Sequence, residues 1–381
     1  MIYLDYAATT PMSDRAIEVY REVAKKHFGN SSSLHDFGST AQQILDQARQ
    51  TIGDMVNAES RGIYFTGGGS DSNELAIQSL VKGNTDGSGH LLTTRGEHSS
   101  VRNVFALLEE QGYDVEYIPV DQKGRVKLSA LESMLRKDTI LVSVHHGNSE
   151  IGTIQDLRSI GKLLDQRDIL FHSDCVQTFG KIPVDVKACH LDSISISAHK
   201  IYGPKGVGAA YVRPALSWKP VIPGTTQEKG FASGTVNVPG VGAFMAAARD
   251  IARQREDELE RERTLRNQFL DLLMESEFDV TLEGDPENSL PNIIGLRIHG
   301  MEGQYAMIEC NRYGLAISTG SACSVGSEKP AASMVALGRD EQEAREFIRI
   351  SLGKQTTEEE ISEAFNILEK VLTRHFSMIK L

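Results

Sequence analysis

A lysine in an unusual position gives the strongest chemical signal in this sequence. Lys200 follows SISISAH, an alternation of serine and isoleucine that predicts a buried strand, and the turn Gly203-Pro204 comes three residues later. Burial disfavours the charged form of an amine, so a lysine at this strand end is suited to form a Schiff base with a carbonyl group. The alternative is a lysine that reaches water from the end of the strand.

A carboxylate follows another predicted strand. Asp174 comes directly after the run Ile169–Ser173, and Gln177 lies three residues further on. A carboxylate at a strand end can pair with the pyridinium nitrogen of pyridoxal 5′-phosphate (PLP) and keep it protonated, which makes that cofactor an electron sink. Gln177 could then reach the phenolic oxygen of the ring. Alternatively, Asp174 caps a following helix.

The segment YFTGGGSDSNELA carries a possible phosphate-binding turn. Gly67, Gly68 and Gly69 separate a predicted strand from Ser70 and an expected helix. Glycine lets the backbone approach a ligand closely, and free N–H groups at the start of a helix suit a phosphate. The segment matches neither of the common nucleotide-binding patterns, GxxxxGK[ST] and GxGxxG.

A histidine and a cysteine complete the set of candidate residues. His98 follows the predicted strand His90–Thr94, where an imidazole can stack on a flat ring or serve only the structure. Cys323 lies in ISTGSACSVG, a run of small residues that predicts an exposed loop. Exposure and a lowered pKa make a thiol reactive. We expect the other cysteines to be buried: Cys175, Cys189 and Cys310.

Strands alternate with helices through the first two-thirds of the chain. The predicted strands are Gly62–Thr66, His90–Thr94, Val115–Pro119, Thr139–His145, Ile169–Ser173, Ser193–Ser197 and Val207–Val212, and the clearest helical patterns between them are Ser99–Gln111, Ser129–Arg136 and Leu157–Gln166. This alternation predicts an α/β fold with a mostly parallel sheet, whose ligands bind at the carboxyl ends of the strands.

The pattern changes near Gly240. A long helix is expected from Val241 to about Met274, followed by a strand at Asn292–His299, a helix at Tyr305–Tyr313 and a closing helix from Glu358. A chain of 381 residues suits two domains. We therefore expect a large domain of residues 12–250 and a smaller α+β domain of residues 251–381, with residues 1–11 packed against the smaller one.

Composition excludes several classes of protein. A net charge of −12 argues against a nucleic-acid binder. No apolar run approaches the roughly 18 residues of a membrane span. The start MIYLDYAATTP lacks the pattern of a secretory signal, which favours a cytoplasmic protein. The four cysteines have no metal-ligand spacing, so no metal site is expected.

Eight motifs in order along the chain resemble one family of enzymes. They are YLDYAATTP (3–11), GNSSSLH (29–35), EH (97–98), GNSEIG (147–152), SDCVQ (173–177), SAHKIYGP (197–204), STGSAC (318–323) and IRISLG (348–353). Together they resemble the cysteine desulfurases of the NifS/IscS type, within the class-V aminotransferases. The resemblance implies fold-type I of the PLP-dependent transferases and an active site at the interface of a homodimer.

The resemblance also implies how the cofactor is held. PLP would be carried on Lys200, which would also move the α-proton of the substrate, while His98 would stack on the ring and assist proton transfers. Asp174 would pair with the ring nitrogen and Gln177 with the phenolic oxygen, and Asn148 would lie beside the cofactor and the substrate. The residues implied to hold the phosphate are Gly69, Ser70, Ser197 and His199, with Thr235 from the neighbouring subunit.

The implied substrate is free L-cysteine. Arg349 would bind its carboxylate through two parallel hydrogen bonds, a geometry that arginine suits better than lysine. Cys323 would attack the substrate sulfur and hold it as a persulfide, with alanine as the other product. The sulfur would then pass to an acceptor protein such as an iron–sulfur scaffold.

The chain departs from the family pattern at several positions. Ser149 stands where an asparagine usually contacts the cofactor or substrate, and Lys229 and Ala232 replace two arginines. Ser70 replaces a threonine and keeps its hydroxyl. Another class-V enzyme, an aminotransferase or a selenocysteine lyase, would use the same lysine, and a PLP-fold scaffold for iron–sulfur assembly is the non-enzymatic alternative. The Cys323 loop and the reaction products distinguish these possibilities.

Overall fold

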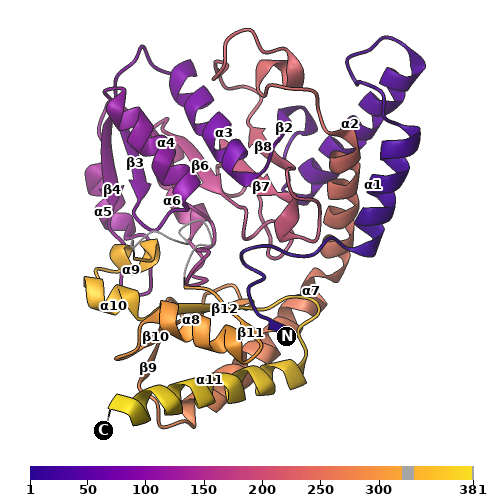
Figure 1. The fold of residues 1–381 in the computed structure, drawn as a ribbon. Coiled ribbons are helices and arrows are strands. Elements are labelled where there is room, and N and C mark those ends of the chain that lie inside the picture. The colour runs from indigo at the N-terminus through magenta and orange to yellow at the C-terminus, as the bar shows by residue number, and fades with distance from the viewer. Residues whose placement is uncertain (320–329, 380–381) are drawn as a thin grey trace.

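The computed structural model of the protein describes residues 1–319 and 330–379. Figure 1 shows an upper, larger part built on a central sheet and a lower, smaller part that ends in a long helix. The N-terminus lies between the two parts.

The central sheet has seven strands in the order β2-β8-β7-β6-β5-β3-β4. Strand β8 is antiparallel to both of its neighbours, and the other adjacent pairs are parallel. This arrangement confirms the predicted α/β fold with a largely parallel sheet. The strands are β2 (Ile63–Thr66), β3 (His90–Thr94), β4 (Asp114–Ile118), β5 (Thr139–Ser143), β6 (Leu170–Asp174), β7 (Ser193–Ser197) and β8 (Gly208–Val212).

Helices cover both faces of this sheet, which explains why its strands are apolar throughout. Successive strand residues enter opposite cores: Leu141 packs with the cluster that includes helices α3 and α4, and Val142 packs with the cluster that includes α1, α2 and α7. The helices of this part are α1 (Asp14–Lys26), α2 (Asp36–Met55), α3 (Gly69–Gly83), α4 (Ser99–Glu110), α5 (Leu128–Met134) and α6 (Leu157–Asp165).

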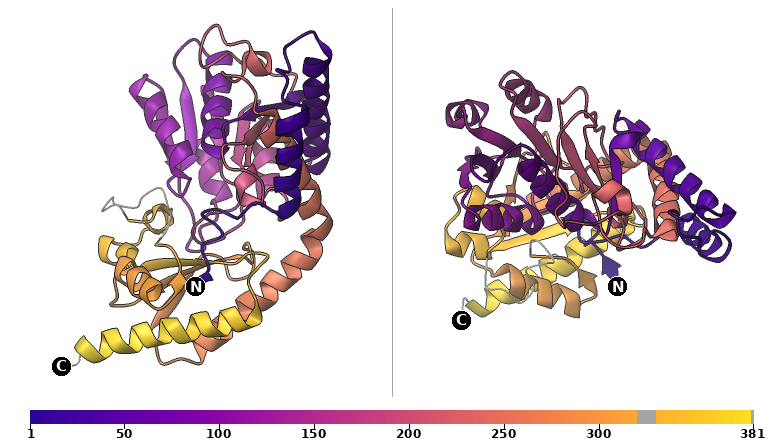
Figure 2. Two further views of the ribbon diagram at one scale, coloured as in Figure 1. Left: turned by 45° about the vertical axis from the view of Figure 1, so that its right-hand side comes forward. Right: turned by 90° about the horizontal axis from the view of Figure 1, so that it is seen from above.

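Helix α7 (Val238–Met274) joins the two parts of the molecule, as both views in Figure 2 show. It begins three residues before the predicted start at Val241, because the side chain of Asn237 accepts a hydrogen bond from the Gly240 N–H and so caps the helix. Among the described residues, no helix, α7 included, has the length and apolar character needed to cross a membrane.

The apolar residues of α7 serve two separate cores. Phe244 and Ile251 pack in the core of the large part, whereas Leu265 and Phe269 pack in the core of the small part. The two ends of one continuous helix therefore belong to different cores. The division into residues 12–250 and 251–381 stays a prediction.

The small part is built on an antiparallel sheet in which β10 (Ile293–Ile298) lies between β9 (Val280–Glu283) and β12 (Phe347–Ser351). Strand β1 (Ile2–Tyr3) pairs with β11 (Leu315–Ala316), and Leu4 enters the core of this part. The N-terminal segment then crosses to the large part between the two cores. The helices are α8 (Gly303–Arg312), α9 (Ala332–Ala336), α10 (Glu341–Arg345) and α11 (Glu358–Ile379).

Candidate active site

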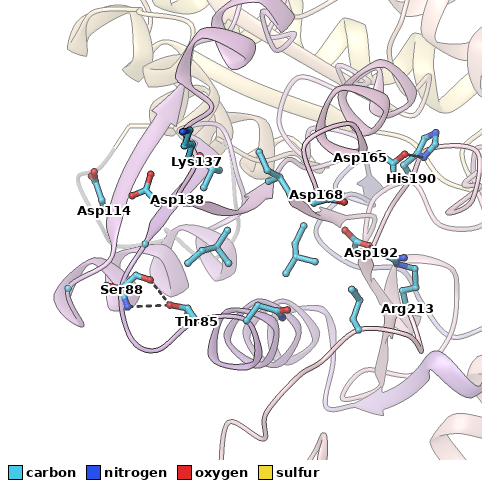
Figure 3. Close-up of a pocket in the computed structure, with 18 residues that line it drawn as sticks. Thr85, Ser88, Asp114, Lys137, Asp138, Asp165, Asp168, His190, Asp192 and Arg213 are labelled. Carbon is cyan, nitrogen blue, oxygen red and sulfur yellow. Dashed lines mark hydrogen bonds and ion pairs between the residues drawn. The ribbon is translucent and has the colours of Figure 1, made fainter.

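One wide cavity, of about 840 Å³, lies at the amino ends of the parallel strands. Its acidic groups face basic partners: Asp165 lies 3.2 Å from His190, and Asp192 lies 2.7 Å from Arg213 (Figure 3). Ligands of parallel sheets bind at the opposite edge. None of the residues singled out by the sequence lines this cavity, so it is not the candidate site.

A smaller cavity, of about 160 Å³, lies at the carboxyl ends of β6 and β7. It brings together side chains from segments that are far apart in the sequence, including the N-terminal segment and β12. Nine predicted site residues line it: Gly69, Ser70, His98, Ser149, Asp174, Gln177, His199, Lys200 and Arg349. Three others do not line it: Asn148, Ser197 and Thr235.

Lys200 lies at the end of a single 3₁₀ turn, Ala198–Lys200, that directly follows β7. Its Nζ donates hydrogen bonds to the carbonyl oxygens of Ala7, at 2.5 Å, and Ala8, at 3.0 Å. Burial, together with the positive charges of Arg349 and Lys181, lowers the pKa of Lys200 to about 7. The amine is therefore largely uncharged above that pH, which is the form that reacts with a carbonyl group.

Asp174 ends β6 and is buried. Its Oδ1 accepts a hydrogen bond from the N–H of Val176 at 2.9 Å, and its Oδ2 accepts one from the side-chain amide of Asn73 at 2.8 Å. Burial raises the pKa of this carboxyl group above its ordinary value. A buried carboxylate of this kind is stabilised by a cation, and the pyridinium nitrogen of PLP is such a cation.

Asn73 connects Asp174 to His98. The second hydrogen of its amide goes to Ser100 Oγ at 2.9 Å, and Ser100 Oγ lies 2.8 Å from His98 Nδ1. His98 precedes helix α4, and its Nδ1 also accepts a hydrogen bond from the Ser100 N–H. This network orients the imidazole and the carboxylate together.

Other residues of the cavity wall are of the kind expected for a phosphate site. Helix α3 begins at Gly69, where an added Cβ would lie only 2.7 Å from a Val176 methyl group, so the backbone approaches this strand end as only glycine allows. Ser70 and His199 line the cavity. Ser197 lies behind Gly69, and its buried Oγ has no hydrogen-bond partner among the described residues.

Gln177 has a similarly incomplete set of hydrogen bonds. Its Nε2 donates to the carbonyl oxygen of Ala7 at 3.0 Å, while its Oε1 is buried without a partner in the described part of the chain. Buried polar atoms are rarely left unpaired in folded proteins. Together with the start of α3 and the Asp174 carboxylate, the unpaired atoms of Gln177 and Ser197 fit PLP.

Arg349 reaches the cavity from β12 and is almost completely buried. Its Nη2 donates to Asp5 Oδ1 at 2.6 Å, and its Nη1 donates to the carbonyl oxygen of Ser149 at 2.9 Å. Asp5 fixes the guanidinium group at the mouth of the cavity. A substrate carboxylate can bind there if it shares or replaces these contacts.

Among the described residues, Asn148 and Thr235 are predicted site residues that do not line this cavity. The Asn148 side chain donates to the carbonyl oxygen of Gly96 and accepts from the N–H groups of Glu150 and Ile151, so it shapes the loop. Thr235 is exposed, in the segment before α7. Cys323 lies outside the described residues.

The prediction that the other cysteines are buried is confirmed for two of them. Cys175 and Cys310 are fully buried, and burial raises the pKa of both thiols, to about 12 for Cys310. The prediction is wrong for Cys189, which is partly exposed because it lies within the turn of residues 186–190 and not in a strand. Burial still raises the pKa of the Cys189 thiol, so none of the three is set up as a nucleophile.

Sequence reasoning missed the residues that orient the site. Asn73 and Ser100 hold Asp174 and His98, Asp5 holds Arg349, and His145 lines the cavity. A local signal existed for Asn73, which lies one helical turn after Gly69. No local signal identifies Asp5, which is 344 residues from its partner.

Comparisons with known proteins agree with this geometry. The family model "Aminotransferase class-V" matches residues 2–364. The chain is 49% identical over 365 residues to the putative cysteine desulfurase NifS of Bacillus subtilis, covering 95% of this chain and 92% of that protein. A solved NifS-like protein superposes with a TM-score of 0.90 at 31% identity, covering 98% and 99% of the two chains. SspA in complex with cysteine superposes with a TM-score of 0.80 at 32% identity, covering 92% and 99%.

Proposed function

This chain belongs to the aminotransferase class-V family, and we propose that it is a PLP-dependent cysteine desulfurase that converts L-cysteine to L-alanine and keeps the sulfur as a persulfide on Cys323. The observation that carries this proposal is the cavity in which an amine with a lowered pKa, Lys200, lies with a buried carboxylate and an arginine. The cysteine desulfurase name of its relative and the cysteine bound by SspA support the choice of substrate.

The residues that would hold PLP are those whose polar atoms lack partners or face the cavity. Asp174 would hold the ring nitrogen, Gln177 the phenolic oxygen, and His98 one face of the ring. When bound, the cofactor withdraws electrons from the α-carbon of the amino acid. The start of α3 would hold the phosphate, with Ser70, Ser197 and His199.

Lys200 has two functions in this proposal. Its Nζ would hold the cofactor, and its free amine would take the proton from the substrate α-carbon. A base works best when its pKa is close to the operating pH, and the pKa of Lys200 is about 7. The carbonyl oxygens of Ala7 and Ala8 hold the amine in place between proton transfers.

Sulfur transfer requires a second nucleophile. The Cys323 thiolate would form an S–S bond to the substrate sulfur while the bond between that sulfur and the β-carbon breaks. The electron pair of the broken bond stays on carbon, which is then protonated to give alanine. Cysteine and one enzyme thiol thus become alanine and one enzyme persulfide, and a thiol or an acceptor protein such as an iron–sulfur scaffold removes the sulfur.

Substitution of Arg349 by lysine tests the binding of the substrate carboxylate. The variant keeps the positive charge but loses the two parallel N–H donors, so we expect the KM for L-cysteine to rise about tenfold or more. The measurement is steady-state alanine formation as a function of cysteine concentration. Arg345→Lys, an exposed position on α10, is the control and should leave KM unchanged. An unchanged KM in Arg349→Lys would mean that the carboxylate binds elsewhere.

We also infer a homodimer. Phe28, Leu34 and Phe37, around the turn from α1 to α2, are exposed to 66%, 102% and 54%. The rings of Phe28 and Phe37 lie 5.6 Å apart, and exposed apolar side chains that form one patch mark an interface. Thr235 does not face the cavity of its own chain, which suits a role in the neighbouring subunit. Light scattering on the cofactor-loaded protein should give twice the chain mass, and a fully active monomer would contradict the inference.

A dependence on a 2-oxo acid separates this function from that of an aminotransferase. A desulfurase forms alanine from cysteine with only a thiol reductant present, because the amino group never leaves the carbon skeleton. We expect alanine formation to be the same with and without added pyruvate or 2-oxoglutarate. Turnover that requires a 2-oxo acid would identify an aminotransferase instead.

A further inference from the structure

Besides His98 and His199, a third histidine lines the cavity and has no part in the function proposed above. His145 lies two residues after the end of β5 and is only 6% exposed. It shares the cavity wall with Lys200, Asp174 and Arg349. A buried, ionisable side chain in the wall of a cavity is a candidate to bind the molecule that occupies the cavity.

Glu97 fixes one side of the His145 ring. Nδ1 of the imidazole lies 2.9 Å from Glu97 Oε1, and the same oxygen accepts the backbone N–H of His145 at 2.9 Å. Thr94 donates a third hydrogen bond to it at 3.1 Å. Because a carboxylate only accepts hydrogen bonds, Nδ1 carries a proton, and the ring orientation is set by this contact.

The other ring nitrogen is unpaired. Nε2 of His145 is buried and has no hydrogen-bond partner anywhere in the described part of the chain. Burial alone would lower the pKa of this imidazole, but the charges of Glu97 on the segment before α4, Asp174 on β6 and Glu150 on the loop after β5 outweigh it, so the pKa is raised. When the ring is protonated, it carries an N–H at Nε2 as well as at Nδ1. A buried N–H without an acceptor is costly, so an acceptor is to be expected from a bound molecule.

The neighbouring histidine, His146, differs from His145 in its contacts, in its pKa and in its place relative to the cavity. His146 is equally buried, but its Nδ1 lies 3.0 Å from Thr178 Oγ1, and it does not line the cavity. Burial and the charge of His145 lower the pKa of His146 to about 4. The pKa values of these two adjacent histidines are thus shifted in opposite directions, and only the one with the carboxylate partner lines the cavity.

We propose that His145 is a further binding residue of this cavity, whose Nε2–H donates a hydrogen bond to an anionic atom of the molecule bound there. The choice of probes rests on the proposed function: the acceptor belongs either to PLP or to the amino acid. An anionic oxygen, of the cofactor or of the amino-acid carboxylate, is the shared chemistry. Glu97 is then a positioning residue, which holds the ring and keeps it charged.

Nuclear magnetic resonance on protein labelled with ¹⁵N-histidine tests this proposal without any substitution. In the cofactor-free protein, both ring nitrogens of His145 should be protonated at pH 7, while His146 should be neutral. Addition of PLP is one arm, and addition of the unreactive analogue S-methyl-L-cysteine to the PLP-loaded protein is the other. The arm that shifts the Nε2 resonance identifies the source of the acceptor. A neutral His145, or no shift in either arm, would overturn the proposal.

Two substitutions separate binding from a purely structural role. His145→Asn keeps an amide N–H near the Nδ1 position, facing Glu97, and loses the donor at Nε2, whereas His145→Gln does the reverse. We expect His145→Asn to weaken binding of the relevant probe about tenfold, as loss of a charge-assisted hydrogen bond predicts, and His145→Gln to stay within about threefold of the unsubstituted protein. His146→Gln is the matched control and should bind both probes normally.

The opposite ranking, with His145→Asn normal and His145→Gln impaired, would show that only the Glu97 contact matters and would refute the binding role. Both arms measure binding by absorbance and resonance shifts, without turnover. A failure here therefore leaves the desulfurase proposal intact. Conversely, a protein that binds PLP through His145 but forms no alanine would refute the function and not this inference.

Discussion

Replacement of Lys200 by alanine is expected to abolish activity, with a loss of alanine formation of at least about a thousandfold. The variant loses both the amine that carries PLP and the base that takes the α-proton, and general acid–base catalysis alone contributes about 10²–10⁴-fold. The yellow absorbance of lysine-bound PLP should disappear, although PLP can still bind non-covalently. Absorbance spectroscopy and alanine quantification measure the two losses separately.

Lys205→Ala is the matched control for this experiment. Lys205 lies five residues further along the chain and is exposed, so its loss should leave both colour and activity unchanged. If Lys200→Ala turned over cysteine at the normal rate, the assignment of the cofactor-bearing lysine would be wrong. The site would then have to be sought among the other lysines, beginning with Lys181.

Replacement of Cys323 by serine should separate cofactor chemistry from sulfur transfer. The contacts expected to hold PLP lie in the cavity and do not involve Cys323, so the variant should bind PLP and show a spectral change when cysteine is added. It should form no persulfide and almost no alanine, because a serine hydroxyl is not ionised near neutral pH and is a poor acceptor of sulfur. We expect a loss of alanine formation of about 10²-fold or more, measured in parallel with the absorbance change.

The three remaining cysteines provide the controls. Cys175→Ser, Cys189→Ser and Cys310→Ser should keep most of the activity, apart from a packing cost at the two buried positions, because the pKa of each thiol is raised. Mass spectrometry after treatment with cysteine should find one added sulfur, on the peptide that contains Cys323. A stable persulfide on another cysteine, or full activity in Cys323→Ser, would refute this assignment.

The local alternation of apolar and polar residues predicted those site residues that lie at the ends of strands. Lys200 ends the turn that follows β7, and Asp174 is the last residue of β6; these two strands are parallel neighbours and end at one edge of the sheet. Their meeting in one cavity therefore follows from the alternation of strands and helices. The same reasoning placed Gly69 at the start of a helix on that edge.

The contacts that orient these groups could not be predicted locally. Asp5 meets Arg349 only because the N-terminal segment pairs with the small part before it crosses to the large one. Asn148 has the residue type of a binding group, but its Nδ2 donates to the carbonyl oxygen of Gly96 and its Oδ1 accepts from N–H groups of its own loop. His145 and His146 are adjacent histidines that the sequence alone does not distinguish. Only the contact of His145 with Glu97 in the folded chain distinguishes them. In each case, contacts between segments that are far apart in the sequence determine what the side chain binds.

The central claim, that this protein removes sulfur from cysteine and leaves alanine, is tested most directly by measuring both products in one reaction. The PLP-loaded protein is incubated with L-cysteine and a thiol reductant, and alanine and sulfide are quantified over the same time course. We predict that the two form in a ratio of one to one, with no 2-oxo acid required. Sulfide accompanied by pyruvate and ammonia instead of alanine, or no sulfide at all, would contradict the account.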